Sequence, residues 1–330
     1  MPSLLDMTDI PMRLILAKSN FRSIQNLRKS CRDLRHFIDD VKPESDVSQI
    51  YIQQDLYQIN LALDIDQRNY DIIYQKWDNG CKVKRNRVSE KVLKHSDFVE
   101  IACKDIESIL ESQKSGILEK FEVFLCDRPE KQNGIPNIVA TQLTENLQKI
   151  LKAQNLKVKK FKITFGCPEK IMSFLPFLEP GTLEHIILKA RRENSKCDLS
   201  GIWELEQWKN AKKLVFGNIL VPDDFPVSSF VQFQEAFLEI ERVTLDMVVD
   251  MKEAFLTHKH MEYFEIKYDR YDVSGNQLEE QFGPGYRKSK WFFRIPEDSE
   301  KFLLMSFSSM DLLCFKRIEK KGIPGDAMIY

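Results

Sequence analysis

Side chains that could bind a metal ion or transfer protons are scattered along this sequence of 330 residues, which contains five histidines. The closest two are His258 and His260, and a pair of imidazoles at this spacing could coordinate a metal ion. They lie between a helical pattern and an alternating one, so a solvent-exposed turn is the simpler interpretation. No serine-hydrolase, dinucleotide-binding, phosphate-loop or zinc-protease motif occurs. We therefore expect a protein that is not an enzyme and that holds neither a metal nor a cofactor.

A second stretch with chemical potential is GPGYRKSK, Gly283–Lys290, which combines glycines with basic residues. A phosphate-binding loop needs a lysine and a serine or threonine directly after its last glycine, because these side chains position the phosphates. That element is missing here, and we expect a surface loop.

Two basic stretches, KVKRNRVSEKVLKH and LKVKKFK, could contact the phosphates of a nucleic acid. In strands, however, Lys82 and Lys84 would share an outward face, and Phe161 and Ile163 would point inward. The net charge of -1 gives no chain-wide attraction for nucleic acid. Solvated strand faces are the favoured interpretation, and an RNA-associated protein is an alternative.

The cysteines and the N-terminus bear on the compartment. The seven cysteines form no C-x-x-C pair, which is typical of reduced thiols in an intracellular protein. No apolar run is long enough for a membrane span, and Asp6 and Asp9 interrupt any signal-peptide pattern. We expect an intracellular protein, in the cytoplasm or the nucleus, with no membrane partner.

Residues 1–42 show a helical pattern and are locally basic, with eight Lys or Arg against five Asp or Glu. Thr8 or Asp9 can cap a first helix that has Pro11 in its first turn. The next stretch, FRSIQNLRKSCRDLRHFID, has apolar residues three and four positions apart, which predicts one unbroken helix from Ser23 to Asp40. Helical units below about 40 residues rarely hide all their apolar surface. The surplus must pack on the rest of the chain, as a helical cap, or contact another protein.

From about Val47 the pattern alternates. VSQIYIQ reads as a strand, and IIYQKWDNGCKVKR predicts a hairpin with a type I′ turn at Asn79-Gly80. The following stretch, SDFVEIACKDIESILES, has helical spacing, with Ser96 or Asp97 as its cap.

An apolar triplet of the form apolar-x-x-apolar-x-apolar recurs in the second half of the chain. Its last members are 25, 28, 29 and 21 positions apart. An earlier copy and a degenerate later one end at Val123 and Phe293. The full copies are Val158/Phe161/Ile163, Leu183/Ile186/Leu188, Ala211/Leu214/Phe216, Ile240/Val243/Leu245 and Met261/Phe264/Ile266.

This spacing is typical of a leucine-rich-repeat-type solenoid, in which stacked units bury a common core. The connectors PEKIMSFLPFLEPG and FVQFQEAFLEI have helical spacing. The asparagine expected after each strand is absent, so we expect an irregular solenoid. A plain α+β domain with similarly placed strands is the alternative.

Three parts of the sequence resemble one known family. LLDMTDIPMRLILAKSNFRSIQNLRKSCRDLRHFIDDVKP resembles the F-box of the large nematode F-box family. The hairpin with NGC and the stretch DFVEIACKDIESILESQKSGILEKFEVFL resemble the linker of those proteins. LPFLEPGTLEHIIL and QWKNAKKLVF resemble their C-terminal FTH domain. The resemblance covers nearly the whole chain.

The resemblance implies an α+β fold in three parts. Residues 1–43 would be an F-box-like helical domain, and 44–115 a β-rich linker region that contains the hairpin and a helix. Residues 116–330 would be an FTH-like, irregular leucine-rich-repeat-like α/β domain.

The resemblance also implies the function of a substrate receptor in an SCF-type ubiquitin ligase. The F-box would bind a Skp-type adaptor of the cullin complex, and the C-terminal domain would bind an unknown target protein. The adaptor-facing residues implied by the match are Leu5, Met7, Ile10, Met12, Ile15, Leu16, Leu27, Cys31 and Leu34. The alternative is an interaction scaffold that is no longer coupled to the ligase.

Three departures from the family pattern bear on this expectation. The family commonly has proline at the position of Thr8 and an apolar residue at that of Ser19. A buried hydroxyl without a partner costs roughly 1–3 kcal/mol, which would weaken adaptor binding about tenfold or more. The family also breaks its helix near Ser30-Cys31, where the apolar pattern predicts a continuous one.

Overall fold

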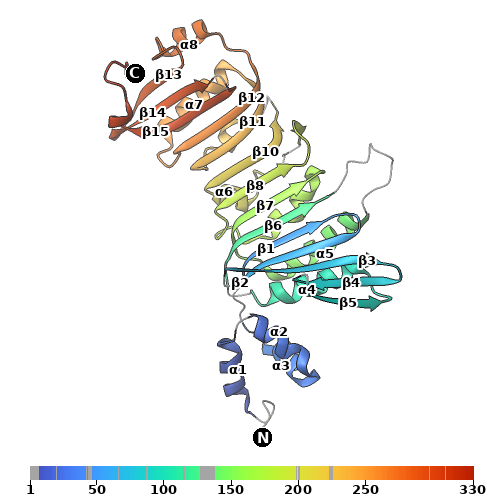
Figure 1. The fold of residues 1–330 in the computed structure, drawn as a ribbon. Helices are drawn as coiled ribbons and strands as arrows, with labels where there is room; N and C mark the ends of the chain where they lie inside the picture. The colour runs from blue at the N-terminus through green and yellow to red at the C-terminus, as the bar shows by residue number, and fades with distance from the viewer. Residues whose placement is uncertain are drawn as a thin grey trace. The chain divides into compact units, whose positions relative to one another are not determined.

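The computed structural model describes residues 7–330 apart from 20, 42, 44–46, 66, 87, 114–115, 127–137, 198, 200, 223–225, 297 and 309. The chain forms two compact units, Met1–Leu183 and Glu184–Tyr330 (Figure 1). No helix within the described ranges is long and apolar enough to cross a membrane.

The first unit begins with helices α1 (Asp9–Ala17), α2 (Phe21–Ser30) and α3 (Arg32–Val41). Thr8 has the extended backbone of an N-cap, as predicted, but its side chain makes no capping hydrogen bond. The expected unbroken helix from Ser23 to Asp40 is wrong, because the chain breaks at Cys31. There the backbone N–H of Leu34 donates to the Sγ of Cys31 at 3.4 Å, so the thiol serves as a weak cap for α3.

These helices share a small apolar core. Leu16, Ile24 and Ile38 are buried together, and Leu27, Phe37 and Val41 pack against them. An ion pair between Arg28 Nε and Asp39 Oδ1, 2.6 Å long, joins α2 to α3. Each helix therefore contributes one apolar side to the others.

The rest of the first unit is a sheet in the order β7-β6-β1-β2-β3-β4-β5. β1 to β5 pair in an antiparallel meander, and β6 and β7 extend the sheet by parallel pairing on the other side of β1. The strands are β1 (Val47–Gln54), β2 (Gln58–Ile65), β3 (Arg68–Trp77), β4 (Gly80–Arg85), β5 (Ser89–Lys94), β6 (Leu118–Leu125) and β7 (Val158–Phe165).

Helices α4 (Phe98–Glu111) and α5 (Ile138–Gln154) cover one face of this sheet, followed by the 3-10 turns η2 (Pro168–Ser173) and η3 (Leu175–Phe177) (Figure 1). The predicted cap of α4 is confirmed, because the Asp97 carboxylate accepts from the backbone N–H groups of Val99 and Glu100. The hydroxyl of Tyr74, a fully buried residue of β3, donates to Asp105 Oδ2 of α4 at 2.6 Å. This contact ties the helix to the sheet.

The predicted hairpin is confirmed, but its turn is not the expected one. Trp77 pairs with Gly80, so the loop is Asp78-Asn79, and neither Asn79 nor Gly80 has the positive φ of a type I′ turn. Gly80 lies in β4, where an added Cβ would come within 2.1 Å of the Leu93 carbonyl oxygen in β5. The glycine therefore permits close pairing with β5 and does not make the turn.

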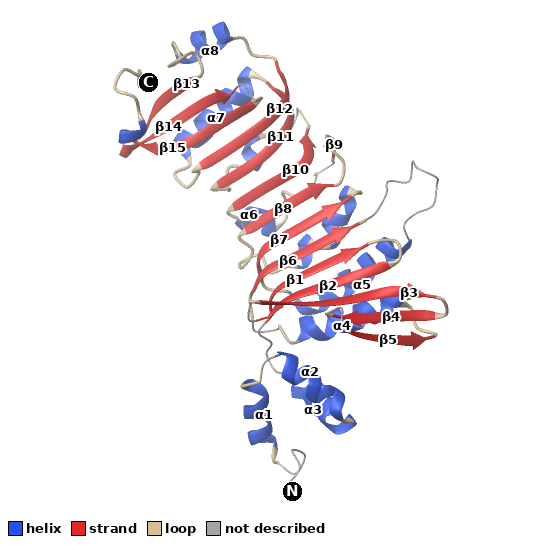
Figure 2. Ribbon diagram, viewed as in Figure 1, coloured by secondary structure: helices blue, strands red, loops and turns tan. Residues whose placement is uncertain are grey.

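The second unit holds a sheet in the order β13-β14-β15-β12-β11-β10-β8, with β9 on the edge of β10. β8, β10, β11 and β12 are parallel neighbours in chain order, and β13 to β15 are antiparallel (Figure 2). The strands are β8 (His185–Ala190), β9 (Ser195–Lys196), β10 (Lys213–Val221), β11 (Glu235–Val243), β12 (Tyr263–Tyr271), β13 (Lys290–Ile295), β14 (Asp298–Ser308) and β15 (Leu312–Glu319).

Two aromatic clusters lie under this sheet. Trp208 packs edge-to-face on Phe233, with ring centres 4.9 Å apart, and its indole N–H donates to the Ser229 carbonyl. Phe255 contacts Phe264 and Phe315 at 5.2 and 5.7 Å. The helical elements of this unit are α6 (Glu206–Asn210), η4 (Val227–Ser229), α7 (Leu245–Thr257), α8 (Gly275–Phe282) and η5 (Lys320–Gly322).

The recurring triplet marks strands in four of its five copies. The copies ending at Ile163, Leu188, Phe216 and Ile266 end in β7, β8, β10 and β12. The Ile240/Val243/Leu245 copy is wrong, because it runs from the end of β11 into α7. The register places Ala236 and Leu238 of β11 beside the other copies.

The same error affects the connector FVQFQEAFLEI, which is not a helix but a turn followed by β11. Phe230, Phe233 and Phe237 are three and four positions apart and so imitate a helical stripe. Phe230 and Phe233 instead pack on Trp208 from the turn. The later degenerate copy lies in β13, which is antiparallel and does not continue the parallel series. The leucine-rich-repeat-like assignment stays a prediction.

Candidate interaction surfaces

The stretches that were candidates for chemistry lie in surface loops. His258 is the C-cap of α7, and His260 lies in the turn that follows, as predicted. Residues 283–289 form the predicted loop before β13, and Lys290 begins that strand. Among the described residues, no group of three or more His, Cys, Asp or Glu side chains could hold a metal ion.

Helix α1 has two apolar sides, of which only one is packed. Met12 and Leu16 are buried, and Leu16 packs with Ile24 and Ile38 of the other helices. Met7 is 46%, Ile10 73% and Leu14 58% exposed. Ile10 and Leu14 are four positions apart and so lie on one side of α1, and Met7 precedes the helix, which begins at Asp9. We call Met7, Ile10 and Leu14 the α1 stripe.

The residues implied by the resemblance have different environments. Met7 and Ile10 lie on the α1 stripe, and Met12, Leu16 and Leu34 are buried. Ile15, Leu27 and Cys31 are half-buried, and Leu5 lies outside the described residues. Leu14 was not in that set, although its position four residues after Ile10 would have identified it. Of the described members of this set, only Met7 and Ile10 are exposed.

Ser19, which replaces an apolar residue of the family pattern, has a hydrogen-bond partner. Ser19 is half-buried, and its hydroxyl donates to the carbonyl oxygen of Ile15 at 2.7 Å. In the free chain the helix itself satisfies this hydroxyl, and the effect of Ser19 on adaptor binding stays a prediction. Thr8 is exposed.

The second candidate surface is the face of the second sheet that lies opposite its aromatic core. The parallel register aligns Ile187 of β8, Val215 of β10 and Phe237 of β11 in one row. Tyr263 of β12 lies 5.5 Å from Phe237 between ring centres. We call Ile187, Val215, Phe237 and Tyr263 the open-face row. The Lys213–Glu235 ion pair, 2.7 Å long, lies beside it.

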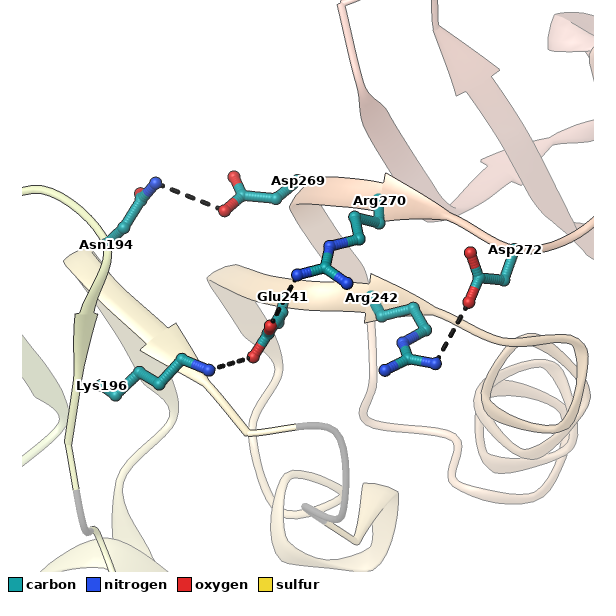
Figure 3. A network of polar contacts seen from close by, with 7 residues as sticks. All are labelled: Asn194, Lys196, Glu241, Arg242, Asp269, Arg270 and Asp272. Carbon is teal, nitrogen blue, oxygen red and sulfur yellow. Dashed lines mark hydrogen bonds and ion pairs between the residues drawn. The ribbon is translucent and has the colours of Figure 1, made fainter.

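A network of charges borders this face at the carboxyl ends of β11 and β12 (Figure 3). Glu241 accepts from Lys196 at 2.6 Å and from Arg270 at 3.2 Å. Arg242 contacts Asp272 at 3.2 Å, and the amide of Asn194 donates to Asp269 at 3.3 Å. The carboxyl ends of parallel strands are a common place for functional side chains, since the loops that leave them converge there.

The electrostatics of this network keep its central carboxylate, Glu241, charged. A hydrogen bond from Lys196, aided by the charges of Lys196, Arg270 and Arg242, holds the pKa of Glu241 below its usual range. Glu241 therefore stays ionised near neutral pH and cannot act as a general acid there. The network fixes the segment around Lys196 to the strand ends and presents a mixed-charge surface.

The sequence could not have identified this network. Lys196, Glu241 and Arg270 are far apart in the chain, and each belongs to a different strand. Only the parallel register brings them together.

Residues 141–285 match the family model of the FTH domain. The matched stretch begins within α5 and includes β7, β8, β10, β11 and β12. The FTH family is associated with F-box proteins, which suggests a protein-interaction role, and it is not a known enzyme family. No match was found among curated proteins or among solved structures.

Proposed function

We propose that this chain is a substrate receptor of an SCF-type ubiquitin ligase. In this proposal, residues 1–43 are an F-box-like unit that binds a Skp-type adaptor of the cullin complex. Residues 44–115 link it to an FTH-like, leucine-rich-repeat-like region, 116–330, that binds a target protein. Ubiquitin transfer would belong to the partners.

The observation that carries the proposal is the α1 stripe. Burying one large apolar side chain stabilises a complex by about 1.5–3 kcal/mol, so three neighbouring ones can supply the centre of an interface. The stripe lies in the stretch that resembles the F-box. The FTH match to residues 141–285 supports the same proposal, because that family is associated with F-box proteins.

The open-face row supports the target-binding half of the proposal. Interfaces combine apolar and aromatic anchors with a polar rim. Phe237 and Tyr263 are aromatic anchors, and the network around Glu241 is a preformed rim. A target protein would bury the row and contact the rim.

The test of the first half is adaptor binding by the full chain. The purified chain is mixed with a recombinant Skp-type adaptor, and the dissociation constant is measured by calorimetry. We expect a stable complex, and the double variant Ile10→Glu, Leu14→Glu should weaken it more than tenfold, since carboxylates would replace two anchors.

The matched control is Met310→Glu, Met328→Glu, which places the same two carboxylates on exposed methionines of the second unit. It should bind the adaptor like the natural chain. If the chain binds none of the adaptors tested, this result contradicts the proposal and favours an interaction scaffold that is not coupled to the ligase. Equal weakening in both double variants would also contradict it.

A further inference from the structure

A large basic groove lies in the first unit, away from the α1 stripe. Its volume is about 610 Å³, within the range of roughly 300–1,000 Å³ that is usual for ligand sites. Side chains of α2, α3, β4, β5 and α4 line it. Two smaller hollows lie between α2 and α4. One shares Lys29 with the groove, and the second shares Arg28 with the first, so together they continue the groove along α2.

The lining of the groove carries more positive than negative charge. Lys29, Arg35, Arg85, Lys91 and Lys104 face only two carboxylates, Asp105 and Glu90.

Both carboxylates are already engaged. Asp105 accepts from Tyr74 at 2.6 Å and lies 3.9 Å from Arg85. Glu90 pairs with Lys82 at 2.9 Å. Four cations of the groove, Lys29, Arg35, Lys91 and Lys104, thus have no carboxylate of the described residues in ion-pair contact.

The surplus charge affects the lysine at the centre of the groove. Partial burial lowers the pKa of Lys29, and repulsion from Arg85 lowers it further. A negative group in the groove would relieve this repulsion and favour the charged lysine. The electrostatics therefore point to an anionic ligand.

The floor of the groove is apolar, which narrows the class of ligand. Val83 is buried, and Leu93 and Ile101 are half-buried beside the basic residues. β5 is the edge strand of the sheet, so its outer backbone groups pair with no strand of the described residues. An extended peptide can use such an edge together with pockets for its side chains.

We propose that this groove binds an extended acidic peptide segment that also carries an apolar side chain. Carboxylates would pair with Lys91, Lys104 and Arg35, and the apolar side chain would cover Leu93 and Ile101. Phe21 and Tyr70 line the continuations along α2, but no aromatic residue is among the described residues that line the main groove, and single-stranded nucleic acid binds best where bases can stack. The proposal goes beyond the ligase function and does not depend on it.

The test uses the full chain without adaptor and a fluorescent nine-residue peptide in which aspartate and glutamate flank a central leucine. Fluorescence anisotropy gives its dissociation constant at low salt. The groove variant is Lys91→Glu, Lys104→Glu. Both residues are exposed, so the fold should persist, and circular dichroism confirms it. The matched control is Lys94→Glu, Lys149→Glu, since these lysines lie on β5 and α5, are exposed and do not line the groove.

We expect saturable peptide binding that the groove variant weakens about tenfold or more and the control leaves within about twofold. Replacing the peptide's carboxylates by amides should abolish binding, and replacing its leucine by serine should weaken it.

Three results would overturn the proposal. One is no binding, or unchanged binding by the groove variant. Another is equal weakening by both double variants, which would mean only nonspecific attraction. The third is tighter, salt-sensitive binding of a single-stranded RNA of the same charge, which would identify a nucleic-acid site.

Discussion

The N-terminal helices and the second sheet bury apolar residues on different scales. The helices share a core of three buried residues with three partly buried neighbours, and leave the α1 stripe in solvent. The second sheet buries whole aromatic clusters, including Trp208, Phe233 and Phe255. A small core contributes little to the free energy of unfolding, whereas a large core contributes enough to hold polar and charged residues in place at its edge. In the function proposed above, the helices complete their burial on the adaptor.

The largest expected effect tests the sheet side of this contrast. Trp208→Ala should lower the free energy of unfolding by about 3–5 kcal/mol, because it leaves a cavity among Phe216, Phe230 and Phe233. Leu14→Ala, on the α1 stripe, should change it by less than about 0.5 kcal/mol. Urea unfolding followed by circular dichroism measures both. Similar effects from the two variants would remove the contrast.

The next effect is local to the helices. Leu16 is fully buried in their small core, and Leu16→Ala should cost about 2–5 kcal/mol there. In this variant, α1 to α3 should unfold locally while the sheets stay folded. Hydrogen exchange should show faster exchange of the amides of α1 to α3, while those of β1 and β2 stay protected. If the helices and the first sheet lose protection together, the helices are not a separate cooperative element.

The smallest effect concerns a carboxylate on the first sheet. Burial pushes the pKa of Glu122 upward, but hydrogen bonds from Lys120 and Lys162, at 2.5 and 2.7 Å, outweigh it and leave the pKa below its usual range. The ion pairs therefore stabilise the fold above the ordinary carboxyl pKa, and this stability is lost as pH falls through the lowered value.

Glu122→Gln should thus lower the free energy of unfolding by about 1–3 kcal/mol at pH 7 and have a smaller effect in acid. Thermal unfolding across the acidic range measures the difference. Glu119→Gln is the control, because the Glu119–Lys159 pair is exposed and should contribute little. A Glu122 effect that does not depend on pH would show that the ion pairs are not its source.

Local patterns predicted the elements better than their boundaries. The helix capped by Asp97 and the hairpin of β3 and β4 were evident because their signals lie within a few residues. The apolar pattern missed the break at Cys31, which the family resemblance implied, since a thiol cap leaves the apolar spacing intact. The turn was placed one residue late because Gly80 serves the approach of β5.

Contacts between distant residues could not be predicted at all. The Glu241 network depends on the register of β11 against β12. The basic groove combines residues of α2 with residues of α3, α4, β4 and β5. The sequence showed the lysines around position 91 and suggested solvated strand faces, but Lys82 and Lys84 are half-buried, and Lys82 lies over the Trp77 ring and pairs with Glu90. Nothing in one sequence indicated that Lys29 and Lys104 lie beside Lys91.

The place of β1 has a consequence for how the chain is made. β1 lies inside the sheet, between β2 and β6, yet β2 begins at Gln58 and β6 only at Leu118. At about 5–20 residues per second, a ribosome needs roughly 3–12 s to synthesise the intervening chain. During that interval the edge of β1 that will pair with β6 is unpaired, and β1 carries residues such as Ile50 and Ile52 that are buried in the finished fold. A chaperone that binds exposed strands could bind this edge of β1 before β6 and β7 have formed the parallel part of the sheet.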